Sequence, residues 1–86
     1  MKYKVKTRVQ VITDNRTITD TDFSGWLCVN TGSTNVVVNK VTLQPQEGLD
    51  FTAVSSPDVL WDSPIQIVAA GGELTLTQLI YKENKL

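Results

Sequence analysis

The chain has 86 residues, of which 41% are hydrophobic, and a formal net charge of −1 at pH 7. This length allows one small domain over residues 1–86, whose core is marginal because such a chain buries only about 60–65% of its unfolded surface. Histidine is absent and Cys28 is the only cysteine, which excludes an intrachain disulfide and removes the commonest general base and metal ligand. The composition therefore argues against an enzyme, and we expect no cofactor and no metal.

The basic residues are concentrated at the N-terminus. Residues 1–8 contain four basic residues and no acid, whereas residues 9–86 contain four basic and nine acidic residues, a net charge of −5. Either this basic strand lies at a subunit edge against an acidic neighbouring surface, or its side chains face solvent and protect an edge strand from aggregation. The candidate contact residues are Lys2, Lys4, Lys6 and Arg8.

Strands are predicted throughout the chain. No window repeats apolar residues at helical spacing, valine, isoleucine and threonine are abundant, and turn signals recur about every 8–12 residues. We therefore predict an all-β fold, a single-domain antiparallel β-sandwich that is jelly-roll-like or immunoglobulin-like, with about seven short strands. The candidate ranges are 2–12, 17–21, 25–30, 35–38, 41–44, 49–53, 65–70 and 73–81, of which one is not expected to form, and residues 82–86 are predicted to be a polar tail.

The first strand alternates strictly in polarity. One face carries Tyr3, Val5, Thr7, Val9 and Val11, and the other carries Lys2, Lys4, Lys6, Arg8 and Gln10. Alternation with a period of two is typical of a strand with one buried face, so we expect the apolar set to lie on the core. The range 17–24 fits either a short edge strand or a loop. The strand that begins after Gly25 is apolar on both faces and is expected inside a sheet.

A hairpin is predicted around Asn39 and Lys40. A two-residue loop there pairs residues 36–38 with 41–43 and places their apolar side chains on one face, so the apolar pattern agrees with the turn. Lys40 is unfavourable at positive φ, and a wider loop is the alternative.

Glycines are predicted to mark two further turns. In the first, Pro45 fixes φ early and Gly48 is free to take a positive φ late. In the second, a two-residue loop at 71–72 pairs residues 65–69 with 74–78 as a hairpin. After Gln78 the apolar phase shifts to Leu79 and Tyr81. Either a bulge near Gln78 explains this shift, or the strand end leaves the domain and packs on a neighbour, which makes Tyr81 a candidate interface residue.

Candidate chemistry is sparse. The acids at positions 14, 20 and 22 lack the ligand number and the glycine bend of a calcium loop, and we interpret them as solvated turn residues. Asp58 and Asp62 have no supporting residues for carboxylate-pair catalysis. Cys28 has no histidine to activate it, and we interpret it as a small buried apolar group.

Trp61 is the one aromatic residue placed to act as a contact residue. It lies in the long loop SSPDVLWDSP, residues 55–64, and long loops tend to be functional. Either its ring contacts a partner, or it folds over the edge of the core.

Three turn signatures together resemble those of known proteins. They are Asn30-Thr31-Gly32 after a strand, the hairpin VVVNKVTL over residues 36–43, and the turn PQEG over residues 45–48. They resemble small β-sandwich proteins of tailed-bacteriophage virions, which include capsid decoration, head-fibre and tail or neck components. The resemblance covers about residues 26–81.

The resemblance implies a non-enzymatic structural protein that forms a homo-oligomer and contacts other virion proteins, so we expect it in the virion after assembly in the host cytoplasm. No signal peptide and no membrane span is expected, because the N-terminus lacks an apolar core and no apolar run approaches ~20 residues. The alternative function is a glycan or host-surface binding module that uses the Trp61 loop. A nucleic-acid partner for the basic strand is disfavoured by the acidic remainder of the chain.

Overall fold

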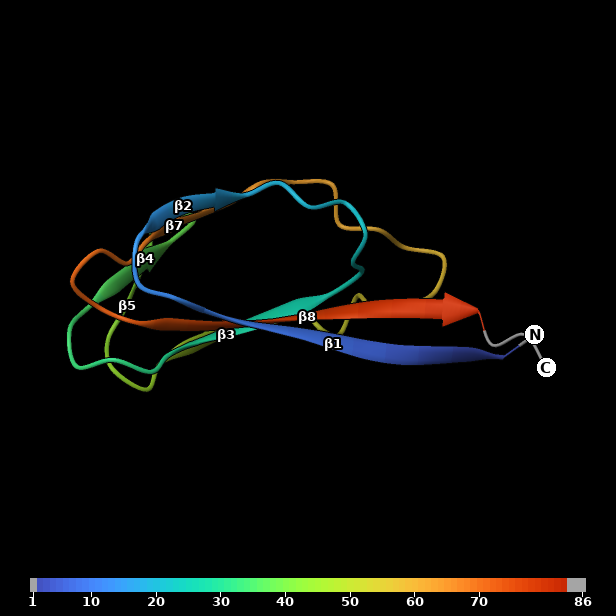
Figure 1. The fold of residues 1–86 in the computed structure, drawn as a ribbon, viewed down its shortest axis with the longest axis horizontal. Helices are drawn as coiled ribbons and strands as arrows, with labels where there is room; N and C mark the ends of the chain where they lie inside the picture. The colour runs from blue at the N-terminus through green and yellow to red at the C-terminus, as the bar shows by residue number, and fades with distance from the viewer. Residues whose placement is uncertain (1, 84–86) are drawn as a thin grey trace.

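The computed structural model describes residues 2–83, which form eight strands (Figure 1). The strands are β1 (Tyr3–Ile12), β2 (Asn15–Ile18), β3 (Trp26–Asn30), β4 (Val36–Val38), β5 (Val41–Leu43), β6 (Gly48–Asp50), β7 (Ile65–Val68) and β8 (Leu74–Glu83). No helix among these residues is long and apolar enough to cross a membrane. The doubtful range at 17–21 does contain a strand, although it begins earlier, at Asn15.

The strands make two antiparallel sheets of four. Sheet 1 has the order β1-β8-β3-β6, and sheet 2 has the order β2-β7-β4-β5. Strand one pairs with eight, two with seven, three with six and four with five, so the chain is one long hairpin rolled into a two-layer sandwich. This is the arrangement of a jelly roll. The predicted all-β sandwich is confirmed.

The core lies between the two sheets. The buried apolar residues alternate with exposed ones along the strands, as a sheet with one covered face requires. The fully or nearly fully buried set is Ile12, Ile18, Phe23, Trp26, Cys28, Val36, Val38, Leu43, Ile65, Ile67, Ala69, Leu74 and Leu76. The side chain of Cys28 is buried, as predicted, and β3 lies between β8 and β6 inside sheet 1, also as predicted.

The predicted hairpin β4–β5 forms with the expected register. Val36 pairs with Leu43 and Val38 with Val41. The loop has only two residues, and both Asn39 (φ 48°) and Lys40 (φ 69°) take left-handed backbone conformations. A two-residue loop needs this conformation to match the twist of its strands, so the geometry of the turn overrides the poor preference of lysine.

The turn after β5 differs from its prediction. The positive φ is at Gln46 (72°), directly after Pro45, and not at Gly48. Glu47 N donates to Gln44 O at 3.0 Å, which closes a turn with the left-handed residue in its third position. Gly48 instead opens β6 and lies so close to the carbonyl of Cys28 that a Cβ would collide with it. The glycine is needed for close approach of two strands.

The predicted hairpin at 71–72 is wrong. β7 belongs to sheet 2 and β8 to sheet 1, so this turn carries the chain from one layer to the other. Gly72 N donates to Ala69 O at 2.8 Å, and Gly71 has a φ of 82°. The residues predicted to share a face, such as Ile67 and Leu76, are nevertheless buried together, because each lines the inner side of its own sheet.

β8 has no bulge at Gln78. Its register with β1 is continuous from Leu74 opposite Ile12 to Glu83 opposite Tyr3. The phase shift therefore reflects a strand whose final residues extend past the sandwich together with the start of β1 (Figure 1). Lys82 and Glu83 belong to this strand rather than to a tail, and the rest of the predicted tail lies outside the described residues.

Candidate interaction surface

Among the described residues there is no cluster that could hold a metal ion, and the one thiol is buried. No three residues among His, Cys, Asp and Glu in the 2–83 range are placed to hold a metal ion. Burial raises the pKa of the Cys28 thiol, which keeps it in the unreactive protonated form at neutral pH. The acids Asp20 and Asp22 stay exposed, but they are ion-paired with Arg8 rather than simply solvated.

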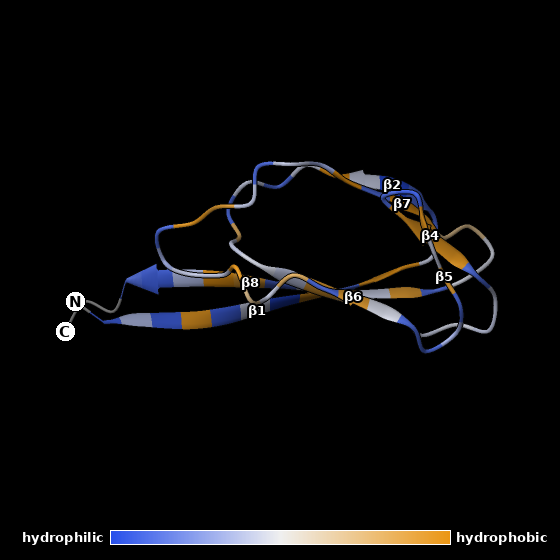
Figure 2. Ribbon diagram, turned by 180° about the vertical axis from the view of Figure 1, so that it is seen from behind, coloured by the Kyte–Doolittle hydropathy of each residue, from blue (hydrophilic) through white to orange (hydrophobic). Residues whose placement is uncertain are grey.

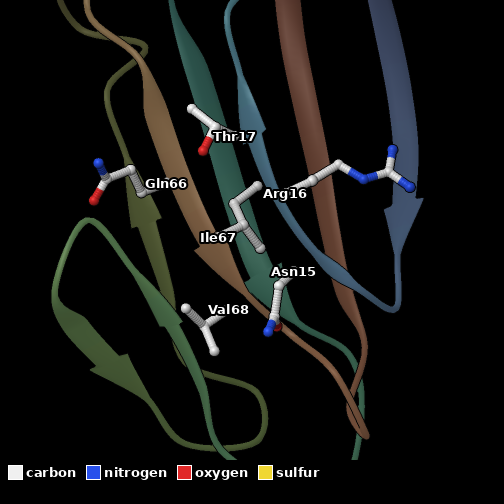
Figure 3. Close-up of a pocket in the computed structure, with 6 residues that line it drawn as sticks. All are labelled: Asn15, Arg16, Thr17, Gln66, Ile67 and Val68. Carbon is white, nitrogen blue, oxygen red and sulfur yellow. The ribbon is translucent and has the colours of Figure 1, made fainter.

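Two shallow hollows lie on the surface. One of 330 Å³ is lined by Asn15, Arg16, Thr17, Gln66, Ile67 and Val68, and one of 510 Å³ by Thr31, Gly32, Ser33, Gly71, Gly72 and Glu73. In the first, Arg16 points away from the other five residues (Figure 3) and forms an ion pair with Asp14 at 2.8 Å. The Oδ1 atom of Asn15 accepts hydrogen bonds from the backbone N–H groups of Ala69 and Ala70. These polar groups serve the fold and do not converge on a ligand.

The outer face of β1 is the main exposed apolar surface of sheet 1. It consists of Tyr3, Val5, Thr7, Val9 and Val11, and alternates with polar residues along the strand (Figure 2). Val5 is 52% exposed, and Val9 and Val11 are each 58% exposed. The prediction that this set lies on the core is therefore wrong. We call these five residues the outer β1 face.

The opposite face of β1 is turned toward sheet 2, because the last residue of the strand, Ile12, lies on that face and is apolar. Ile12 is fully buried, and two-residue alternation from Ile12 turns Gln10 and Arg8 inward as well. These polar side chains meet Gln78, which is also fully buried. Gln78 Oε1 accepts hydrogen bonds from Arg8 Nε at 2.8 Å and from Gln10 Nε2 at 2.9 Å. Satisfied polar groups of this kind can occupy the edge of a core.

Arg8 is engaged within its own chain. Its guanidinium donates to both carboxylate oxygens of Asp22 at 2.9 Å and to Asp20 at 3.2 Å. The hydrogen bond from Arg8 lowers the pKa of the Asp22 carboxyl below its ordinary value, against a smaller opposing effect of burial. Of the four candidate basic contacts, only the three lysines therefore remain available to a partner.

Those three lysines are joined by a fourth that sequence reasoning assigned to the tail. Lys4 lies directly opposite Lys82 across the β1–β8 pair, and Lys6 lies opposite Ile80. Lys2 precedes the strand in the same alternation. All four lysines are exposed, and none forms an ion pair with any residue in the described range. We call Lys2, Lys4, Lys6 and Lys82 the basic ribbon.

Trp61 packs against the edge of the core. Its ring lies 5.6 Å from that of Trp26 in an edge-on arrangement and 5.5 Å from that of Phe51. Trp61 N donates to Phe23 O at 2.8 Å, which ties the loop to the sandwich. The exposed apolar residues of this loop are its neighbours Val59 and Leu60, not the tryptophan, so the ring is not presented as a flat platform for stacking.

Tyr81 lies on the outer side of sheet 1, directly opposite Val5. Its hydroxyl is 3.0 Å from Ser55 Oγ, and Ser55 itself lies against the backbone of Gly25 so closely that a Cβ at Gly25 would be 2.8 Å from the Ser55 Cβ. Tyr81 thus continues the outer β1 face onto β8 and links it to the loop that follows β6. It is half-buried in the chain by itself.

No protein-family model, curated protein or solved structure matches this chain. Two features distinguish the candidate interaction surface from the rest of the described residues, namely the apolar outer β1 face and the basic ribbon at its end. The sequence contains a signal for the outer β1 face, because Ile12 is apolar and two-residue alternation from it places Thr7, Val9 and Val11 on the opposite face. The basic ribbon has no such local signal, because it depends on the pairing of β1 with β8.

Proposed function

We propose that this chain is a non-enzymatic structural protein that acts through protein–protein contacts and forms a homo-oligomer. The observation that carries the proposal is the outer β1 face. Val5, Val9 and Val11 are each more than half exposed on one edge strand. Burying the exposed parts of these side chains would gain roughly 1 kcal/mol each, which favours association for a domain whose own core is small.

The edge position of β1 adds a second reason. β1 is ten residues long and pairs on one side only, with β8. A long edge strand with an apolar face is a template for association. The lysines that alternate with these residues lie on the other face of β1, and their charge limits uncontrolled pairing of this edge strand with other strands. A specific partner must therefore fit an edge strand that is apolar on one face and basic on the other.

The proposed setting is a bacteriophage virion, as a capsid decoration or a tail or neck component. Two arguments support it. The turn signatures at 30–32, 36–43 and 45–48 resemble those of such proteins, and jelly rolls are common among viral capsid domains. The second argument is an analogy of fold, which by itself does not imply function.

The mass of the purified chain in solution tests the proposal. Light scattering at low and high salt should give a stable oligomer of defined size. A monomer at every concentration and salt would contradict self-assembly. For the virion setting, mass spectrometry of phage particles from cells that encode the chain should detect it in a fixed ratio to other particle proteins, and its absence would contradict that setting.

A further inference from the structure

The basic ribbon carries positive charge outside the ion pairs of residues 2–83. One acid is affected by this charge, Asp22, whose pKa is lowered first by the hydrogen bond from Arg8 and to a smaller extent by the charge of Lys82. Lys4 and Lys82 lie directly opposite each other on one face of a two-stranded extension, and like charges in this position are destabilising. Glu83 follows Lys82 on β8 and lies opposite Tyr3, and therefore on the other face. Tyr3 and Val5 are exposed on that other face. The β1–β8 extension thus presents positive charge on one face and apolar area on the opposite face.

The loop between β6 and β7 has the opposite character. We call residues 54–62 the acidic loop. Asp58 and Asp62 are exposed, and neither forms an ion pair with any other residue between 2 and 83. Val54, Val59 and Leu60 are exposed beside them, Leu60 by 63%. The loop presents negative charge and apolar area together.

The acidic loop is held in place within its own chain. Ser56 N donates to Ser24 Oγ at 2.9 Å, and Val59 N donates to Ser56 O at 3.2 Å. The Trp61 ring and its backbone bond to Phe23 anchor the other end. Such a loop pays little ordering entropy on binding, which is what a docking surface requires.

We infer that the basic ribbon of one copy docks on the acidic loop of a second copy. This inference rests on the proposed homo-oligomer and adds a second contact to the one proposed for the outer β1 face. The lysines of the ribbon lie on one face of the β1–β8 extension, and Tyr3 and Val5 lie on its opposite face. On the loop, Asp58 and Asp62 flank Val59 and Leu60. The lysines then pair with Asp58 and Asp62 across the contact, and their aliphatic stems cover Val59 and Leu60.

A second copy fits the charges better than nucleic acid does. Residues 7–79 carry three basic and eight acidic residues, a net charge of −5. Every copy therefore offers an acidic surface to the ribbon of another copy. A duplex DNA bound at the ribbon would instead be repelled by the acidic body behind it.

Paired charge reversals test the contact. The ribbon variant is Lys4→Glu with Lys6→Glu, and the loop variant is Asp58→Lys with Asp62→Lys. All four positions are exposed and outside ion pairs of residues 2–83, so thermal unfolding should show that both variants fold. By sedimentation velocity at low salt, each variant alone should self-associate about tenfold or more weakly than the wild type, because like charges then meet.

The equimolar mixture of the two variants is the decisive sample. The acidic ribbon of one variant now faces the basic loop of the other, so association should return to about the wild-type level, and salt should weaken it. Lys40→Glu, an exposed lysine on the β4–β5 hairpin, is the matched control and should leave association unchanged. Wild-type association without any effect of either variant would overturn the inference while leaving the proposed oligomer intact.

Two other results would overturn it differently. A wild-type chain that stays monomeric up to about 1 mM would remove both the contact and the homo-oligomer. A monomer that binds a short DNA duplex with steep salt dependence, lost in the ribbon variant, would replace the second copy with nucleic acid.

Discussion

The buried side chain of Gln78 allows polar residues on the inner face of β1. It is fully buried, yet its carbonyl oxygen accepts hydrogen bonds from Arg8 and Gln10, so the inner face of β1 can be polar where it meets β8. Its amide group lies 3.5 Å from Asp20. The cluster removes Arg8 from the basic surface and leaves only lysines on the projecting ribbon.

Replacing Gln78 with leucine should destabilise the fold by about 1–3 kcal/mol, because Arg8 and Gln10 each lose a partner in a partly buried site. Urea unfolding followed by tryptophan fluorescence measures this change. Gln66→Leu is the matched control, since Gln66 is exposed on β7, and it should change the free energy of unfolding by less than about 0.5 kcal/mol. Equal effects would show that the buried cluster contributes nothing particular.

Asp22 should make stability depend on pH in the acid range. The Arg8 hydrogen bond lowers the pKa of Asp22 in the folded protein. A depressed folded pKa gives stability that is present above the unfolded value of about 4 and is lost as the pH falls through that value toward the folded pKa. Because Asp22 is 59% exposed, solvent screening limits its share to below about 1 kcal/mol.

Asp22→Asn should therefore flatten the loss of stability below about pH 4 without abolishing it. The pKa values of Asp14 and Asp50 are also lowered, through hydrogen bonds from Arg16 and Thr52, and they act in the same direction. Thermal unfolding between neutral pH and about pH 3 measures the slope. Asp58→Asn is the control, and an unchanged slope in Asp22→Asn would contradict the role of the Arg8 pair.

In the β4–β5 hairpin, one residue has a backbone conformation that its side chain disfavours. Its register satisfies the apolar pattern, but Lys40 has a φ of 69°. Asn39 tolerates the same region well, and it also bonds to β7 through Gln66, whose N–H donates to Asn39 Oδ1 at 2.8 Å. The backbone strain of this hairpin is therefore located at Lys40.

Lys40→Gly should stabilise the protein by about 0.5–1 kcal/mol, because glycine adopts positive φ without a Cβ penalty. The midpoint of urea unfolding should rise. Lys40→Ala is the control that removes the side chain and keeps the strained Cβ, and it should stay near the wild type. A larger gain for alanine than for glycine would show that the charge, not the backbone, limits the hairpin.

The molecule as a whole is a sandwich with one extended end. Its long axis is 45 Å, against 20 and 19 Å for the others, and β1 and β8 run together beyond the strands of sheet 2 (Figure 1). The outer β1 face runs along this extension and along the sandwich. The exposed apolar side chains on this long edge strand are the basis of the proposed assembly surface.

Val9→Lys should weaken self-association by about tenfold or more, because it places a charge in the middle of the outer β1 face. Folding should be retained, since Val9 is 58% exposed. Val68→Lys is the matched control: Val68 is 51% exposed on β7 of sheet 2 and should leave the oligomer intact. Sedimentation velocity compares the two, and equal dissociation would show that the outer β1 face has no special part in the contact.

Much of the architecture follows from local patterns. Alternating side chains and turn residues predicted an all-β sandwich, the interior strand with Trp26 and the β4–β5 register. The β4–β5 register depends on contacts between residues close in sequence, where the turn and the apolar period constrain the same pairs. The strand type and the two apolar faces of β3 follow from side-chain alternation, although its neighbours in the sheet are distant in sequence. The basic composition of the N-terminal strand was equally plain from the sequence.

Which face of β1 is buried, and which strands pair, was decided only by the tertiary structure. Alternation defines two faces of β1 but not which one a second sheet will cover. The covered face is the one that carries Ile12 and contacts the buried Gln78, which is 66 positions away from Ile12 along the chain. The same glycine pair at 71–72 could close a hairpin or carry the chain between layers, because both outcomes bury Ile67 and Leu76. The pairing of β1 with β8, the most distant strands in the sequence, brought Lys4 opposite Lys82. Local sequence cannot encode such a pair, since it arises from the rolled arrangement of all eight strands.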